Sequence, residues 1–160
     1  MKRLRSYSFF LAMALALLTT AIASCTRGIV YSHFEPIPEE GWERANVLHF
    51  DIGPMADSCA CEERLNLRAT SFYPYTELVL IVDQLARLSG VRCTDTITLK
   101  MVDDHGQSLG SGISSQQFTL PLRQLNLKAD DILHVQVRHN MHHDPLPGVL
   151  DVGIEVKSEE

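Results

Sequence analysis

The sequence predicts an all-β protein, an antiparallel β-sandwich of one domain that follows a lipoprotein signal peptide. Short runs alternate apolar and polar residues, which is the period-two pattern of strands with one buried face. Clusters of glycine, proline and aspartate separate these runs at fairly even spacing. Helical spacing is confined to residues 83–89, where Leu85 and Leu88 stand three apart. Seven or eight short strands favour a sandwich, and the pattern leaves jelly-roll and immunoglobulin-like topologies open.

The strands are predicted in order along the chain. Residues 29–31 form a candidate edge strand within residues 25–40, a segment that we interpret as a tether leading to a β-sandwich domain over residues 41–160. The continuous apolar run at 78–82 is typical of a central strand buried on both faces. The other strands alternate and are predicted at residues 47–52, 64–69, 94–102, 132–137 and 149–156.

The N-terminal segment has the three parts of an export signal. Three basic residues lie within residues 2–5, and an apolar run over residues 9–18 is too short to span a membrane. Ile22-Ala23-Ser24-Cys25 has the aliphatic, small, small, Cys order of a bacterial lipobox. We therefore predict that residues 1–24 are removed and that Cys25 carries lipid; the alternative is an ordinary secretory signal cut near Ala23.

The lipid is expected to be the membrane contact of the mature chain. Each buried acyl CH₂ contributes about 0.8 kcal/mol, and stable anchoring takes more than one chain. Loss of residues 1–24 removes three of the 14 basic residues and none of the 20 acidic ones, which leaves 11 against 20 and a net charge of −9. Such a charge argues against nucleic acid as a partner. The covalent lipid on Cys25 is the attached group that we expect, with no cofactor.

Three cysteines remain besides Cys25, so an exported chain is expected to form at most one disulfide and keep one thiol. Cys59 and Cys61 share one face of any strand. We favour a disulfide between Cys93 and Cys61 or Cys59, which would stabilise the fold by roughly 3–4 kcal/mol. A Cys-x-Cys metal site is the weaker alternative, since a fourth thiol is missing.

Aromatic residues supply the candidate contact surface. Trp42, Tyr73 and Tyr75 are the residues that we predict to bind a partner, because Pro74 interrupts any ladder and turns at least one ring outward. Packing in the core is the alternative for each ring. The stretch at 139–144 contains weak candidate metal ligands, and a solvated loop is the simpler interpretation; these are His139, His142, His143 and Asp144.

Signatures of catalysis are missing from the sequence. It contains no G-x-S-x-G elbow, no phosphate-binding glycine loop, no dinucleotide fingerprint and no H-E-x-x-H helix. Asp103 and Asp104 precede Gly106 in a turn that aspartate favours for backbone reasons. We therefore predict a protein that is not an enzyme.

An ordered set of short signals runs through nearly the whole mature chain. The set comprises the lipobox, Trp42, Val47-Leu48-His49-Phe50, Leu67-Arg68, Tyr73-Pro74-Tyr75, Leu78, Asp95-Thr96, Gly106, Leu109-Gly110 and the closing stretch from Leu146 to Ile154. Taken together it resembles the gliding motility lipoprotein GldH family of Bacteroidetes-type bacteria. Two positions depart from the family pattern: Thr76-Glu77 replace an expected Ser-Asn pair, and Ser108 stands where a tryptophan is expected.

The resemblance implies a membrane-anchored accessory protein of a gliding and secretion apparatus, with other envelope motility or secretion proteins as partners and no enzymatic activity. Surface-directed lipoproteins of such bacteria often carry acidic residues after the lipidated cysteine. Here Thr26-Arg27-Gly28 follows, so we expect a periplasm-facing protein on the inner or outer membrane. The alternative function is a carbohydrate-binding lipoprotein that uses a face of the β-sandwich.

Overall fold

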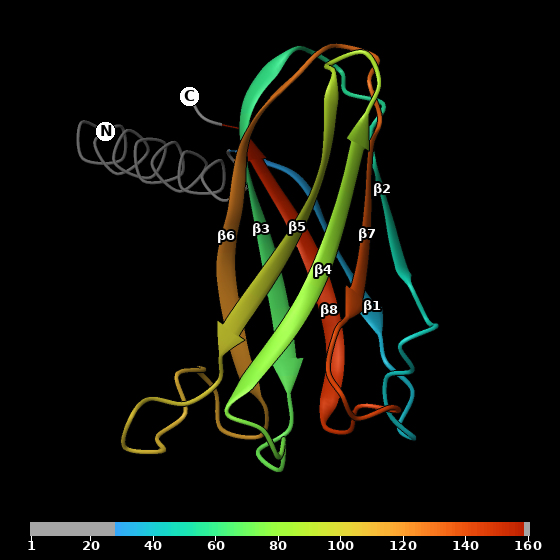
Figure 1. Cartoon of the computed structure of the whole chain (residues 1–160). Coiled ribbons are helices and arrows are strands. Elements are labelled where there is room, and N and C mark those ends of the chain that lie inside the picture. The colour runs from blue at the N-terminus through green and yellow to red at the C-terminus, as the bar shows by residue number, and fades with distance from the viewer. Residues whose placement is uncertain (1–27, 159–160) are drawn as a thin grey trace, which may run out of the picture.

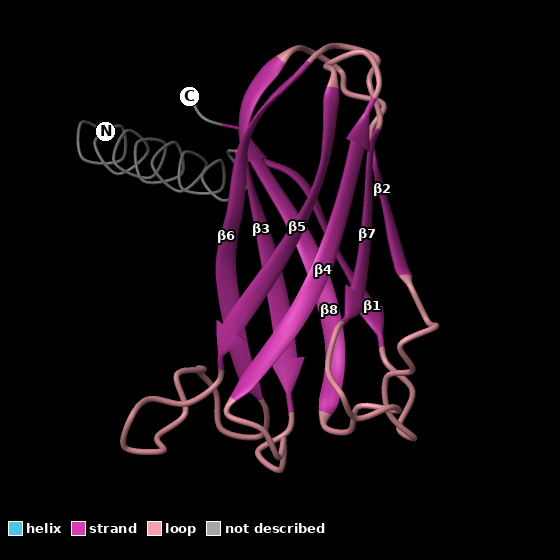
Figure 2. Ribbon diagram, in the orientation of Figure 1, coloured by secondary structure: helices cyan, strands magenta, loops and turns pink. Residues whose placement is uncertain are grey.

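The computed structural model describes residues 28–158, which form eight β-strands and no helix (Figures 1 and 2). The signal peptide and Cys25 lie outside these residues. Within the described part no helix is long and apolar enough to cross a membrane. The strands are β1 (Ile29–Pro36), β2 (Leu48–Ile52), β3 (Cys59–Ala69), β4 (Glu77–Ala86), β5 (Val91–Lys100), β6 (Gln116–Leu127), β7 (Leu133–His139) and β8 (Val149–Ser158).

The strands build two four-stranded antiparallel sheets that pack face to face. One sheet has the order β1-β8-β3-β6 and the other β2-β7-β4-β5, so that β4 and β5 are the only consecutive strands paired with each other. All other connections cross from one sheet to the other. This is the strand order of a jelly roll, which confirms the predicted β-sandwich and decides between the two topologies that the sequence left open.

The core lies between the sheets and follows the period of two. Strand β4 buries alternate residues along its whole length, and β2 buries three of its five. Apolar side chains from both sheets fill this layer, which is the main source of stability in a sandwich. The largest fully buried apolar side chains are Trp42, Phe50, Ile52, Leu65, Leu67, Leu78, Leu80, Leu127, Leu133, Leu146 and Ile154.

The outer face of the first sheet carries a polar cluster around the buried Asp151 of β8. Arg68 on β3 donates three hydrogen bonds to this carboxylate, two from Nε at 2.9 and 2.8 Å and one from Nη2, and its guanidinium lies 5.6 Å from the ring centroid of Phe34. Gly153 makes room for that ring, because a Cβ there would stand 2.7 Å from it. This cluster joins β1, β8 and β3. Asp151 can be buried because its carboxylate is paired with the Arg68 guanidinium.

Two segment predictions are wrong. The tether predicted to end at residue 40 contains all of β1, whose backbone pairs with β8 from Ile29 to Pro36, so the sandwich begins before residue 41. The helical turn predicted at 83–89 is the end of β4, since Gln84 and Ala86 continue the inward-facing alternation. There the register with β5 and β7 overrides the local spacing of two leucines.

Strand β6 was not predicted from the sequence. Its alternation is broken at a β-bulge, where Glu63 pairs with Arg123 and Arg64 pairs with Pro121. Proline is tolerated there because β6 lies at the edge of its sheet and its free side needs no ladder partner. The bulge shifts the inward-facing residues by one, so Phe118 and Leu125 are both buried although their spacing does not fit one period-two run.

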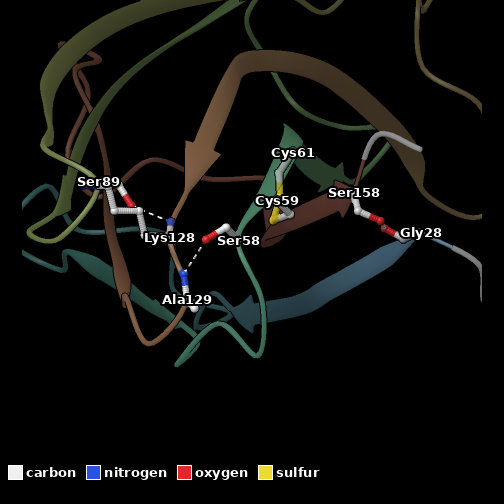
Figure 3. Close-up of a disulfide and its surroundings, with 8 residues drawn as sticks. All are labelled: Gly28, Ser58, Cys59, Cys61, Ser89, Lys128, Ala129 and Ser158. Carbon is white, nitrogen blue, oxygen red and sulfur yellow. Dashed lines mark hydrogen bonds between the residues drawn. A yellow bond between two sulfur atoms is a disulfide. The ribbon is translucent and has the colours of Figure 1, made fainter.

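The disulfide joins Cys59 to Cys61 within β3, and Cys93 is a free thiol (Figure 3). The predicted pairing of Cys93 with Cys61 or Cys59 is therefore wrong. Residues two apart on a strand share a face, and the Cα atoms of Cys59 and Cys61 are 5.8 Å apart, within the reach of a disulfide. Cys93 lies on β5 in the other sheet, where its Sγ donates to Gln84 Oε1 at 3.1 Å.

A carboxyl group sits inside the sandwich. Glu63 is fully buried; its Oε2 accepts a hydrogen bond from the Gln84 amide, and its Oε1 has no partner. Burial raises the pKa of Glu63 to about 7, against smaller opposing effects of Gln84 and Arg123. The folded protein therefore holds a proton that the unfolded chain releases above its ordinary pKa.

The free energy of unfolding is expected to depend on this proton. It should be highest below the unfolded-state pKa and fall as the pH rises to about 7, by on the order of 3 kcal/mol for Glu63. Glu63→Gln should remove that part of the decrease and stabilise the protein at pH 8. Urea unfolding across this pH range measures it, with the exposed Glu77→Gln as control. Parallel profiles for both variants and the wild type would contradict the assignment.

Candidate interaction surface

The two ends of the sandwich differ in their loops. The end where β1 begins carries Gly28 and Ser158, whose backbones are hydrogen-bonded at 2.6 Å; we call it the terminal end. The opposite end, at the bottom of Figure 1, holds the connections at residues 37–47, 70–76, 101–115 and 140–148, and we call it the loop end. The terminal end has shorter connections at residues 53–58, 87–90 and 128–132. Long loops on a rigid scaffold are the usual place for binding.

Trp42 ties two loops of the loop end together. Its backbone exchanges two hydrogen bonds of 2.8 Å with Leu146, and its indole Nε1 donates to the Asn46 carbonyl at 2.8 Å. The side chain is fully buried, so the prediction that Trp42 offers a contact surface to a partner is wrong. The ring instead forms the floor under loops 37–47 and 140–148.

The histidine cluster divides between core and surface. His139 is fully buried, with its ring centroid 5.3 Å from that of Trp42 and its Nε2 3.9 Å from Asp144 Oδ1. Burial lowers the pKa of His139, which Asp144 partly offsets. His142 and His143 are exposed in the following loop. In the part of the chain that the structure describes, no three His, Cys, Asp or Glu side chains come together as metal ligands would.

Tyr73 and Tyr75 lie where the sequence predicted, on loop 70–76, and both are half-buried. Their rings meet edge to face with centroids 5.7 Å apart, and the Tyr73 hydroxyl donates to the Glu77 carbonyl at 3.1 Å. They line a cleft of about 130 Å³ between loop 70–76 and loop 101–115, whose walls include Met101 and Phe118. A cleft of this size and lining can receive one apolar side chain.

Exposed apolar side chains flank the cleft. Phe72 is 90% exposed and stands between the lining residues Ser71 and Tyr73. Leu109 is 55% exposed and follows Ser108, another lining residue, while Ile113 lies fully exposed on the same loop. We call the cleft with Phe72, Leu109 and Ile113 the apolar tip. Clustered exposed apolar residues of this kind mark interaction sites more often than isolated ones.

The four loops of the loop end are acidic as a group. They contain one basic residue, Arg44, and a net charge of −5 with histidine neutral. Arg44 is itself engaged, since its backbone N–H donates to Asp144 Oδ1 at 2.9 Å and its guanidinium donates to the Met141 carbonyl. The acidic residues are Glu39, Glu40, Glu43, Asp103, Asp104 and Asp144.

A second depression, of about 650 Å³, lies on the outer face of the sheet formed by β2, β7, β4 and β5. Its lining is polar and includes His49, Asp51 and His134, with His134 Nδ1 2.7 Å from Asp51 Oδ1. Its lining contains no Phe, Trp or Tyr. It therefore lacks the stacking platform by which the carbohydrate-binding alternative would be recognised.

The residue that sequence reasoning missed is Phe72. Pro74 pointed to an outward ring in this loop, but the alternation could not tell which of three successive aromatic positions it was. Tyr73 and Tyr75 turn toward Phe118 and Met101, which leaves Phe72 in solvent. The sequence feature that could have indicated its exposure is its position next to Ser71, ahead of the packed residues Tyr73 and Tyr75.

Two aromatic substitutions should have opposite consequences. Trp42→Ala removes a fully buried ring and is expected to lower the free energy of unfolding by about 3–5 kcal/mol. Phe72→Ala removes an exposed ring and should change it by less than about 0.5 kcal/mol. Chemical denaturation of the two variants measures both effects. Equal destabilisation would show that loop 70–76 packs differently from the arrangement described.

Comparison with known proteins gives a consistent result. The GldH lipoprotein family matches residues 29–156. A gliding motility lipoprotein GldH homolog of Christiangramia forsetii is 24% identical over 147 residues, 86% of this chain and 89% of that protein. Gliding motility lipoprotein GldH of Flavobacterium johnsoniae is 22% identical over 153 residues, 91% and 95% of the two chains. Among solved structures, Eiger TNF of S. frugiperda has a TM-score of 0.36 at 9% identity, covering 84% of this chain and 94% of that one.

Proposed function

Because this chain belongs to the GldH lipoprotein family, and is therefore a membrane-anchored envelope protein linked to gliding motility, we propose that it acts as a non-catalytic accessory component of a motility and secretion assembly. In this proposal Cys25 carries the lipid and the apolar tip binds the partner. The observation that carries it is the Tyr73–Tyr75 cleft at the end remote from the start of β1, with exposed apolar side chains on both loops that border the cleft.

The position of Cys25 determines which end faces outward from the membrane. Cys25 lies three positions before Gly28, the residue that precedes β1, and an extended chain spans at most about 3.6 Å per residue. The lipid therefore holds the terminal end within roughly 10 Å of the bilayer. The strands that run to the other end are up to 12 residues long, so the apolar tip stands on the order of 40 Å away.

The chemistry of the loop end indicates the kind of partner. The apolar tip favours a protruding apolar side chain, and the acidic loops favour lysine and arginine around it. A second copy of this chain is a poor fit, because two loop ends would bring like charges together. We therefore expect a protein surface with an apolar anchor residue flanked by basic ones.

A non-catalytic role is supported by the same surface. The residues that line the cleft have aliphatic, hydroxyl, aromatic, thioether or amide side chains, and none of them is a histidine, a carboxylate or a cation. A nucleophile held by a base, or a pair of carboxylates set for acid–base work, is not among them. What the cleft offers is shape and apolar area, which suit recognition rather than bond breaking.

Membrane attachment should depend on one thiol. Cys25→Ala removes the atom that carries the acyl chains, so the protein is expected to move to the soluble envelope fraction after a salt wash. Cys93→Ala is the matched control, because Cys93 is a free thiol on β5 and should leave the distribution unchanged. Persistent pelleting of the Cys25→Ala protein with membranes would disprove the anchor.

Partner capture should depend on the apolar tip. In crosslinked cells, Phe72→Ser with Leu109→Ser is expected to reduce recovery of envelope motility or secretion proteins, because both side chains flank the cleft. Tyr75→Ala tests the cleft wall, and the exposed Thr98→Ala on β5 serves as control. Mass spectrometry of the captured proteins measures recovery. Undiminished recovery by the double variant, with unchanged thermal stability, would place the contact elsewhere.

A further inference from the structure

Exposed apolar side chains form a second group at the terminal end. Among the described residues, the large apolar side chains that are most exposed fall at the two ends of the sandwich. Phe72, Leu109, Ile113 and Leu150 belong to the loop end. Ile29, Val30, Leu88 and Ile132 belong to the terminal end, where they are 45%, 44%, 54% and 36% exposed. The proposed partner contact does not use this second group.

Leu88 and Ile132 are neighbours on a firmly held platform. They line one depression, of about 370 Å³, from the β4–β5 turn and the β6–β7 loop. Asp131 joins these segments, since its Oδ2 accepts from the Ser89 N–H at 2.6 Å and its Oδ1 from the Ile132 N–H at 3.0 Å. Ser89 Oγ also accepts from the Lys128 N–H at 2.8 Å (Figure 3). The two apolar side chains are thus fixed in solvent rather than carried on a loose loop.

Charged side chains of both signs lie beside this platform, since Arg87 and Asp130 line the same depression. Arg87 lies beside Leu88, and Arg92 and Lys128 are exposed nearby in sequence; with the described residues none of the three forms an ion pair. The terminal-end loops contain Arg87 and Lys128 against three aspartates, a net charge of −1, compared with −5 at the loop end. Asp131 is buried and occupied by its hydrogen bonds, so the exposed charges of these loops are Arg87 and Lys128 with Asp57 and Asp130.

We propose that the terminal end rests on the bilayer, with Leu88 and Ile132 entering the headgroup layer and Arg87 and Lys128 contacting lipid phosphates. This inference rests on the proposed lipidation of Cys25. The short link from Cys25 to Gly28 reaches only about 10 Å, which leaves no room for a folded partner between this end and the membrane. Exposed apolar side chains with Arg and Lys close by are suited to a lipid interface.

Orientation follows from the contact. One lipid anchor is a single point of attachment and would let the sandwich lie on its side, whereas a second contact at Leu88 and Ile132 holds it upright. The acidic loop end is repelled by an anionic surface, so both effects point the apolar tip away from the lipid. The bilayer contact thus presents the tip to partners rather than adding greatly to the strength of anchoring.

Photo-crosslinking to lipid tests the contact in the intact lipidated protein. Benzoylphenylalanine in place of Leu88 should give lipid adducts in envelope membranes, and the same probe in place of Ile113 should give none. Both positions are exposed turn residues, so neither replacement touches the core. Adducts at 113 but not at 88, or at neither position, would overturn the inference.

A charge reversal provides the second arm. Arg87→Glu with Lys128→Glu should reduce the lipid adduct at position 88, because the new carboxylates repel lipid phosphates. Glu39→Lys with Glu40→Lys at the loop end is the matched control and should leave the adduct at 88 unchanged. An undiminished adduct in the first variant would overturn the role of the cations. Cys25→Ala in the probe-bearing protein shows whether the lipid adducts require the anchor. Protein crosslinks from a probe at position 72 report separately on the apolar tip.

Discussion

The pairing of β1 with β8 is the interaction on which the rest of the arrangement depends. It places Gly28 beside Ser158 and so fixes the end at which the chain enters the sandwich. Eight antiparallel strands then alternate direction, and every connection after an odd-numbered strand falls at the opposite end. The long loops, the Tyr73–Tyr75 cleft and the exposed Phe72 are all on such connections. Without this edge ladder, residues 29–36 would be a slack tether and the lipid would not orient the molecule.

The sequence carried the fold class because each buried strand alternates on its own. Strands β2 and β8 could be predicted because buried residues such as Phe50 and Ile154 follow the period of two along each strand. The sequence did not show which strands pair with each other. β6 combines Pro121 with a bulge, and both are acceptable only because the strand lies at an edge, which is a property of the whole sheet. The turn predicted around Leu85 and Leu88 failed for the same reason, because β4 gains its partners from β5 and β7.

The sequence predicted the loop that carries Tyr73 and Tyr75, but not how each aromatic ring packs. Pro74 correctly indicated a loop in which aromatic residues leave the ladder, whereas burial of Trp42 depends on its contact with Leu146, more than a hundred residues away in sequence. The shared face of Cys59 and Cys61 was visible in the sequence, but the position of Cys93 in the other sheet was not. In the structure Cys93 is drawn into a polar contact with Gln84, and that residue also binds the buried Glu63. Such long-range neighbours leave no trace in a local pattern.

Exposed apolar area is costly for a soluble surface, and its distribution is therefore informative. The sides of this sandwich are covered by polar residues such as Thr96 and Thr98, whereas both ends present leucine, isoleucine or phenylalanine. The two ends differ in what surrounds those side chains: carboxylates at the loop end, and arginine and lysine beside Leu88 at the terminal end. Acidic groups near apolar area disfavour an anionic bilayer and leave a protein as the suitable partner, while cations favour lipid phosphate. In the arrangement that we propose, such a lipoprotein spans the distance between a membrane and its partner assembly, and the length of its strands sets that distance.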